Sequence, residues 1–195
     1  MTAKIRFALV GTSGIAPAHI AAVKNNNDAE LIYIHSRSYD RAKHWAGHYG
    51  LRPAQHFEDI LNDRSIDAVI IATDPARHLE FAFLALEAGK HILIEKPIDH
   101  DLDNAVTFMR KSRGRENIVS VVSQQRFDPD FTALRNNLLN GKVANSNEPY
   151  LPLLFQYIES FSSLFNGNVW VRPVYLIQIN MVSLQPFQAG LASGD

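Results

Sequence analysis

Short apolar runs, each ended by a glycine or a polar cluster, recur through the first 122 residues. The runs at 5–10, 29–35, 67–72, 91–94 and 118–122 contain few polar residues and lack the alternation of a half-exposed strand. Segments suited to helices separate them, at 15–23, 39–48, 76–88 and 101–113. Near-continuous apolar runs are typical of parallel strands buried on both faces. The pattern therefore predicts an α/β fold, a doubly wound parallel sheet of five strands.

Two segments depart from this alternation. Residues 51–66 are predicted to be an irregular crossing with one short helix, Phe57 to Asn62. After residue 122 a helix is expected over 130–140, ending at Gly141. These residues begin a second region, whose pattern differs from that of the sheet.

A glycine turn ends the first apolar run and leads into a helix. It reads Gly11-Thr12-Ser13-Gly14-Ile15, so Ser13 stands at the middle glycine of the pattern G-x-G-x-x-G/A. Such a turn lets backbone N–H groups approach a pyrophosphate, and the positive end of the helix dipole faces its charge. A plain strand-to-helix turn explains these residues equally well. The motif by itself therefore leaves cofactor binding open.

Three polar residues, Ser36-Arg37-Ser38, follow the second apolar run. In a dinucleotide-binding fold this position contacts the adenosine ribose. A carboxylate there would bind the ribose hydroxyls of NAD, whereas Arg37 can pair with a 2′-phosphate, helped by the two serines and by Arg41 one turn into the helix. We therefore predict NADP as the cofactor, with NAD as the alternative. A solvated loop arginine would explain Arg37 without any ligand.

Composition narrows the classes of partner. The chain of 195 residues has 19 Lys and Arg against 20 Asp and Glu, so no basic field attracts nucleic acid. It has no cysteine, which excludes disulfides and thiolate chemistry and suits a cytoplasmic protein. The first residues lack the apolar core of a signal peptide, and no run approaches the roughly 18 apolar residues of a membrane span. We expect a soluble cytoplasmic protein with no nucleic-acid or membrane partner.

Candidate metal ligands are few. His44 and His48 have the i, i+4 spacing of a metal pair, but Trp45 stands where a zinc peptidase has Glu, and no third ligand is evident. A pair of surface histidines is the better explanation. The aspartates at 99, 101 and 103 are expected to be charges at a helix start. We expect no metal site.

Four segments resemble the Gfo/Idh/MocA oxidoreductases, in the same order and at similar spacing. They are VGTSGIAPAHI (10–20), IATDPARH (71–78), LEAGKHILIEKP (86–97) and SQQRFDP (123–129). The third is the most specific, and the resemblance covers about residues 4–142. It implies a Rossmann domain over 1–122, and then an α/β domain with an open antiparallel sheet that covers the nicotinamide. In that family this second domain binds a sugar, cyclitol or related alcohol. Residues 123–195 would be only an incomplete start of it.

The resemblance also implies roles for individual residues. The implied cofactor contacts lie in the glycine turn, after later strands and at the start of the second domain: Gly11, Ser13, Gly14, Ile15, Ala72, Thr73, His78, Glu95, Lys96, Pro97, Gln124 and Arg126. Lys96 would hydrogen-bond the reacting hydroxyl and assist its proton loss. A partly desolvated lysine can do this, and hydride transfer from an alcohol requires such a group. Without the resemblance, Glu-Lys-Pro would be taken for a surface turn.

The resemblance stops near residue 142, where charged residues become sparse. Only Glu148, Glu159, Arg172 and Asp195 follow, and no histidine follows His100, so the acid/base histidine of the family's second domain has no counterpart here. We favour loss of the native second-domain sequence, by truncation or an altered reading frame. A shortened protein with another role and a diverged apolar sheet are the alternatives. We expect the apolar residues 150–165 and 169–182 to promote self-association or poor order.

Two functions follow from these observations. The first is an NADP-dependent dehydrogenase that uses Lys96 on a sugar or polyol, and forms a homo-oligomer if the second domain folds. The second is a catalytically silent cofactor-binding or interaction protein, like the few transcriptional regulators of the family.

Overall fold

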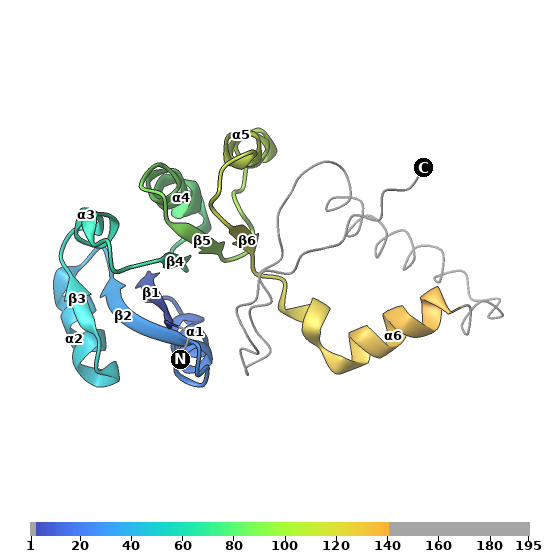
Figure 1. The fold of residues 1–195 in the computed structure, drawn as a ribbon, viewed down its shortest axis with the longest axis horizontal. Helices are drawn as coiled ribbons and strands as arrows, with labels where there is room; N and C mark the ends of the chain where they lie inside the picture. Colours follow the sequence, from blue (N-terminus) through green and yellow to red (C-terminus); the bar gives the residue numbers. More distant parts are fainter. Residues whose placement is uncertain (1–2, 141–195) are drawn as a thin grey trace. The chain divides into compact units, whose positions relative to one another are not determined.

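The computed structural model describes residues 3–140, which form two units that divide between Val122 and Ser123. The first unit contains a parallel six-stranded sheet in the order β3-β2-β1-β4-β5-β6 (Figure 1). Its strands are β1 (Ile5–Val10), β2 (Ala29–His35), β3 (Arg52–Ala54), β4 (Ala68–Ile71), β5 (His91–Ile94) and β6 (Val119–Val121). Its helices are α1 (Ala16–Lys24), α2 (Tyr39–Tyr49), α3 (Phe57–Asn62), η1 (Pro75–Arg77), α4 (His78–Glu87) and α5 (Leu102–Ser112).

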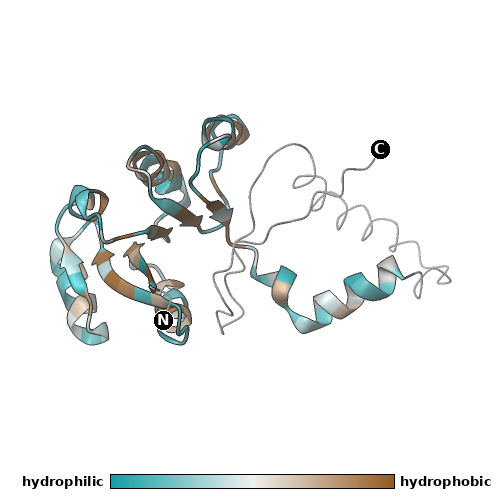
Figure 2. Cartoon of the chain, in the orientation of Figure 1, coloured by the Kyte–Doolittle hydropathy of each residue, from teal (hydrophilic) through white to brown (hydrophobic). Residues whose placement is uncertain are grey.

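The doubly wound parallel sheet is confirmed, because helices cover both of its faces. Alternate residues of β1 show this: Ala8 and Val10 pack with α3, α4 and α5, whereas Phe7 and Leu9 pack with α1 and α2. In Figure 2 most strands are largely brown, whereas the helices mix teal, white and brown along their turns. Burial on both faces explains why the sequence shows apolar runs rather than alternation.

One strand differs from the prediction. Residues 52–54 form β3, which pairs with β2 at the edge of the sheet, whereas the sequence predicted an irregular crossing over 51–66. The run is short and contains Pro53, which has no backbone N–H to donate. Proline is tolerated on edge strands, but the sequence alone did not show that this segment lies at the edge of the sheet. The short helix over Phe57–Asn62 is confirmed as α3.

Lys90 is a buried charge that supports the sheet. The residue is 6% exposed, and its Nζ donates to the carbonyl oxygens of Asp63, at 2.7 Å, and of Ile66, at 2.8 Å. It follows Gly89, whose φ of 75° ends the α4 segment in the left-handed region. Lys90 therefore ties the turn before β5 to the turn before β4.

Lys90→Met is expected to lower the free energy of unfolding by about 2 kcal/mol, because two buried carbonyl oxygens lose their donor. Urea unfolding followed by circular dichroism measures this. The matched control is Lys4→Met at an exposed lysine, which should leave the midpoint unchanged. Equal midpoints for the two variants would contradict a structural role for Lys90.

The second unit is described over residues 123–140, with η2 (Gln124–Phe127) and α6 (Pro129–Leu139). The predicted helix over 130–140 is confirmed as α6. The predictions about the tail, including the apolar segments 150–165 and 169–182, lie outside the described residues. Among the helices of residues 3–140, none has both the length and the apolarity needed to cross a bilayer.

Candidate cofactor site

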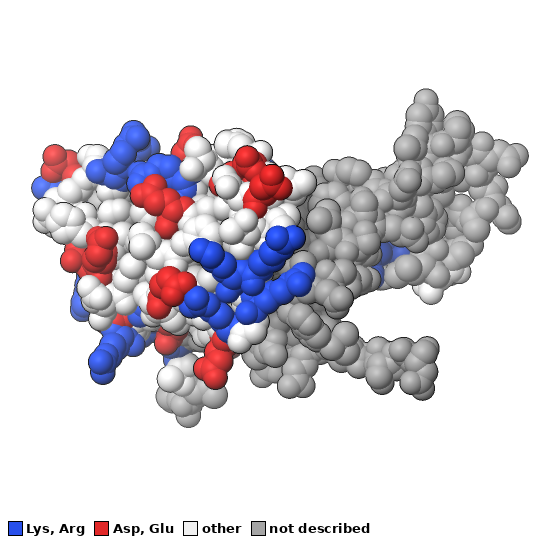
Figure 3. All heavy atoms as spheres, turned by 90° about the horizontal axis from the view of Figure 1, so that it is seen from above, with Lys and Arg blue, Asp and Glu red and all other residues white. Residues whose placement is uncertain are grey.

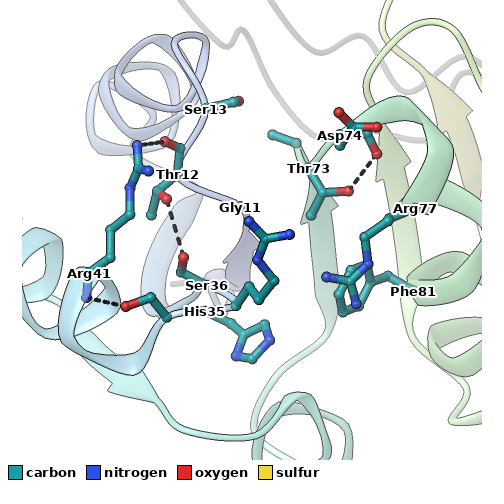
Figure 4. A pocket seen from close by; sticks show the side chains of 13 residues that line it. Gly11, Thr12, Ser13, His35, Ser36, Arg41, Thr73, Asp74, Arg77 and Phe81 are labelled. Atoms are coloured by element: carbon teal, nitrogen blue, oxygen red, sulfur yellow. Dashed lines mark hydrogen bonds between the residues drawn. The ribbon is translucent and has the colours of Figure 1, made fainter.

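A pocket of about 520 Å³ lies at the carboxyl ends of β1, β2 and β4 (Figure 4). Its walls come from the glycine turn after β1, the polar turn after β2, and the segment after β4 with the start of α4. The lining residues are Gly11, Thr12, Ser13, His35, Ser36, Arg37, Ser38, Arg41, Ala72, Thr73, Asp74, Arg77 and Phe81. Most of the residues predicted from the three turns therefore lie around one cavity, where parallel α/β sheets bind their ligands.

Gly11 is required by the packing of the turn. Its φ is 115°, and a Cβ added to it would lie 2.3 Å from the carbonyl oxygen of Ala72 and 2.8 Å from the nitrogen of Thr73. No side chain fits against backbone at that distance. Gly14 differs, because an added Cβ would meet no atom within 4 Å. Backbone contacts within the protein therefore require glycine at position 11, whereas the space beside Gly14 is open.

The start of α1 suits an anion. Ile15 precedes the helix without a side-chain cap, and the first turn contains no acidic residue. The Ser13 hydroxyl oxygen is buried and has no hydrogen-bond partner within residues 3–140. A buried polar atom without a partner is uncommon in folded proteins, and a ligand oxygen would satisfy it. These features fit a bound phosphate beside the positive end of the helix dipole.

The polar turn after β2 holds one free cation within the described residues, Arg37. It is exposed and makes no ion pair or hydrogen bond within residues 3–140. Arg41 is already engaged, since its Nη2 donates to the carbonyl oxygen of Thr12 at 3.0 Å. Ser38 accepts from the Arg41 backbone N–H at 3.4 Å and so caps α2, while the hydroxyls of Thr12 and Ser36 lie 3.3 Å apart. Arg41 and Ser38 thus hold the turn, and Arg37 is left for a ligand.

Four pocket residues were not predicted from the sequence: His35, Asp74, Arg77 and Phe81. The Arg77 guanidinium lies 4.9 Å from the centroid of the Phe81 ring and forms two hydrogen bonds with the Glu80 carboxylate, at 2.9 and 2.8 Å. Arg77 belongs to the segment IATDPARH, so the family resemblance could have identified it as a site residue. No motif distinguishes His35 or Phe81 from ordinary core residues.

His78 lies outside the pocket and joins two of the predicted turns. It is fully buried, with Nδ1 2.8 Å from the carbonyl oxygen of Pro97 and Nε2 3.2 Å from that of Thr73. The imidazole therefore holds the turn after β5 against the turn after β4. Its contacts are those of a positioning residue, although the resemblance implied contact with the cofactor.

Glu95 and His19 form a buried pair at the end of β5. His19 Nε2 lies 2.8 Å from Glu95 Oε1, and the residues are 1% and 7% exposed. The other oxygen, Oε2, accepts from the Lys96 backbone N–H at 3.1 Å. Burial by itself raises the pKa of Glu95, but the hydrogen bonds and charges of His19 and Lys96 outweigh it and place the pKa below its usual value. His19 links α1 to the Glu-Lys-Pro turn, a contact that the sequence did not reveal.

The other predicted site residues are not among those that line the pocket. Lys96 is exposed and, with Gly14, Ile15 and Pro97, is not among the pocket-lining residues. Gln124 and Arg126 lie in η2 of the second unit. His44 and His48 are exposed on α2, and residues 3–140 contain no group of three or more side chains that could hold a metal ion.

On the face shown in Figure 3, acidic and basic side chains are intermixed apart from one local basic group.

Known proteins share this fold and sequence pattern. The family described as "Oxidoreductase family, NAD-binding Rossmann fold" (GFO_IDH_MocA) matches residues 5–123. Inositol 2-dehydrogenase of Rhizobium meliloti is 30% identical over 168 residues, which cover 83% of this chain and 50% of the relative. The chain thus spans about half the length of the curated relatives it matches.

Two solved structures extend the comparison. The 3-ketoreductase KijD10 of Actinomadura kijaniata, in complex with NADP and TDP-benzene, is 28% identical, with a TM-score of 0.65 over 71% of this chain and 43% of KijD10. The WlbA dehydrogenase of Bordetella pertussis, in complex with NADH and UDP-GlcNAcA, is 27% identical, with a TM-score of 0.67 over 71% of this chain and 42% of WlbA. Because the family match covers more than half of its length, this chain belongs to the Gfo/Idh/MocA oxidoreductases.

Proposed function

We propose that the pocket binds NADP, with the glycine turn at the pyrophosphate and Arg37 at the 2′-phosphate of the adenosine ribose. Arg37 supports the proposal most strongly, because it is a free guanidinium on the wall where the ribose is expected. No carboxylate occurs among residues 36–38 to repel the phosphate. The unpartnered Ser13 hydroxyl and the uncapped start of α1 support the position of the pyrophosphate. Relatives bind either NADP or NADH, so the choice rests on this chain's own residues.

For the whole protein we propose a dehydrogenase that acts on a sugar, cyclitol or related alcohol. The nicotinamide, when bound, supplies the hydride acceptor. Lys96 would hydrogen-bond the reacting hydroxyl and hold its proton at Nζ. Glu95 would fix the Lys96 backbone, since it accepts from the Lys96 N–H at 3.1 Å. The similarity to an inositol 2-dehydrogenase and to the WlbA dehydrogenase, which was crystallised with UDP-GlcNAcA, supports this substrate class.

A second candidate is a cofactor-binding protein without turnover. Assays of the full chain with NADP and a panel of sugars and cyclitols separate the two. Turnover that Lys96→Met abolishes would support the dehydrogenase, and tight NADPH binding without turnover would support the silent protein.

Arg37→Asp is expected to weaken NADPH binding about 100-fold, because a charge-assisted hydrogen-bond pair is replaced by repulsion between the new carboxylate and the 2′-phosphate. Binding of NADH, which has no 2′-phosphate, should not weaken. Isothermal titration of both dinucleotides measures the ratio of their affinities. Arg64→Asp, at an exposed arginine after α3, is the matched control. An NADPH to NADH ratio that stays at the wild-type value in Arg37→Asp would refute the assignment of Arg37.

A further inference from the structure

A buried contact outside the pocket joins the first turn of α1 to the end of β5. The His19 backbone N–H donates to the Ile15 carbonyl oxygen at 3.3 Å, so the first turn of α1 carries the His19 ring. Glu95 comes directly after β5, and its backbone N–H donates to the Ile71 carbonyl oxygen of β4 at 2.9 Å. Neither His19 nor Glu95 lines the cofactor pocket. Their side chains therefore connect the helix after the glycine turn to the segment that contains Lys96.

The hydrogen bond between these two side chains has a defined direction. Burial raises the pKa of Glu95, but the hydrogen bond and charge of His19, followed by those of Lys96, hold that pKa below its usual value, so the carboxylate is ionised at pH 7. An ionised carboxylate can only accept, so His19 Nε2 is the donor in the 2.8 Å bond to Oε1. His19 is 1% exposed, and its Nδ1 has no hydrogen-bond partner within residues 3–140. Among the described residues, the ring therefore hydrogen-bonds to Glu95 alone.

His78 provides a contrast within the same chain. Each of its ring nitrogens has a backbone partner, the carbonyl oxygen of Pro97 for Nδ1 and that of Thr73 for Nε2. His19 leaves one buried nitrogen without a partner, and an unsatisfied buried polar atom lowers the stability of the folded state. The imidazole at position 19 is therefore placed for its contact with Glu95 rather than for general packing.

Glu95 connects this contact to the backbone of Lys96. Its carboxylate is one rigid plane, in which Oε1 accepts from His19 and Oε2 accepts from the Lys96 N–H at 3.1 Å. Lys96 is exposed, and its Nζ makes no hydrogen bond or ion pair within residues 3–140. On the other side of Lys96, His78 Nδ1 lies 2.8 Å from the Pro97 carbonyl oxygen. The place of the Lys96 amine therefore depends on its backbone, which Glu95 and His78 hold from two sides.

We propose that His19 is a positioning residue for Lys96: acting through Glu95, it holds the Lys96 backbone at a fixed place relative to α1. The inference rests on the proposed function, in which the glycine turn binds the pyrophosphate and Lys96 Nζ holds the proton of the reacting hydroxyl. The start of α1 and the lysine amine would then keep one separation. A small displacement of a reacting group costs much of the rate, and supporting side chains of this kind prevent it.

The test measures amide hydrogen exchange of the full chain by NMR at pH 7, without ligand. His19→Leu keeps an apolar side chain of similar size but removes the donor, so exchange of the Lys96 N–H should become about tenfold faster relative to that of the Glu95 N–H, which β4 holds. His19→Gln places an amide N–H near the position of Nε2 and should restore the wild-type ratio. His44→Leu, at an exposed position of α2, is the matched control and should leave the ratio unchanged.

A second measurement separates positioning from binding. With NADP and the panel of sugars and cyclitols, His19→Leu should lower kcat about 100-fold, whereas the dissociation constant of NADPH should change less than about twofold. His19→Gln should recover most of kcat. A residue that only stabilises the fold would not produce this split between kcat and cofactor affinity in folded protein.

The outcomes are distinct. An unchanged Lys96 exchange rate in folded His19→Leu would overturn the inference, as would equal acceleration at Lys96 and Glu95 or a wild-type kcat. If His19→Leu fails to fold by circular dichroism, His19→Asn replaces it, because its amide lies near the place of Nδ1 and does not reach Glu95; it should show the same faster exchange. Faster Lys96 exchange in a chain without turnover would overturn the proposed dehydrogenase and leave the support of Lys96 by His19 intact.

Discussion

Gly11→Ala is expected to lower the free energy of unfolding of the first unit by about 4 kcal/mol or more, a loss reserved for severe steric conflict. The added Cβ would lie 2.3 Å from the Ala72 carbonyl oxygen, and φ at this position is 115°, where side chains are strained. Relief requires the end of β1 to move away from the end of β4. Ala72 N–H donates to the Val10 carbonyl oxygen at 2.8 Å, so this movement would also break a bond between the two strands.

Gly14→Ala is the matched control for this prediction. No atom lies within 4 Å of the added Cβ, so the unfolding midpoint in urea should change little. Affinity for NADPH should fall, however, if the pyrophosphate approaches this backbone as proposed. A Gly11→Ala variant as stable as Gly14→Ala would show that the β1 turn is less constrained than its geometry indicates.

His19→Ala is expected to lower the free energy of unfolding by about 3 kcal/mol, because it leaves the ionised carboxylate of Glu95 buried without its partner at 2.8 Å. The Lys96 N–H would remain as a single donor. His44→Ala, at an exposed position of α2, should change stability by less than about 0.5 kcal/mol. Urea unfolding at pH 7 compares the two variants.

The pH dependence of stability tests the same pair. The pKa of Glu95 is lower in the folded protein than its ordinary value, so the unfolded chain binds more protons in acid. Its contribution is therefore present above the ordinary glutamate pKa and is lost as the pH falls through the folded value. Wild type should lose more stability than Glu95→Gln on acidification below about pH 4.5. Parallel stability curves for the two proteins would contradict an ionised, paired Glu95.

The sequence predicted the inner strands because they are buried on both faces, which leaves an unmistakable apolar run such as residues 68–71. It also placed the polar turns correctly, since parallel strands bring their carboxyl ends to one edge of the sheet. His35 could not be recognised in this way. It ends an apolar run, and only the folded structure shows that it lines the pocket, with its Nδ1 3.2 Å from the Ala54 carbonyl oxygen.

The sequence did not distinguish motif residues that stabilise the fold from motif residues that contact a ligand. Lys90 and His78 both lie in segments that carry the family resemblance, yet both are buried and bind backbone carbonyl oxygens. His19 and Glu95 are 76 residues apart, so their contact requires the positions of α1 and β5 in three dimensions. A motif marks such residues without saying whether they hold the fold or contact a ligand.

The proline in β3 has a consequence for the outer margin of the sheet. Edge strands offer unpaired backbone groups to which a strand of another molecule can add, and this is a common route to aggregation. In β3 the middle residue of three, Pro53, has no hydrogen to offer an incoming strand. Pro53 therefore protects the β3 edge of the sheet against the addition of a strand from another molecule. The same residue made β3 difficult to predict from the sequence.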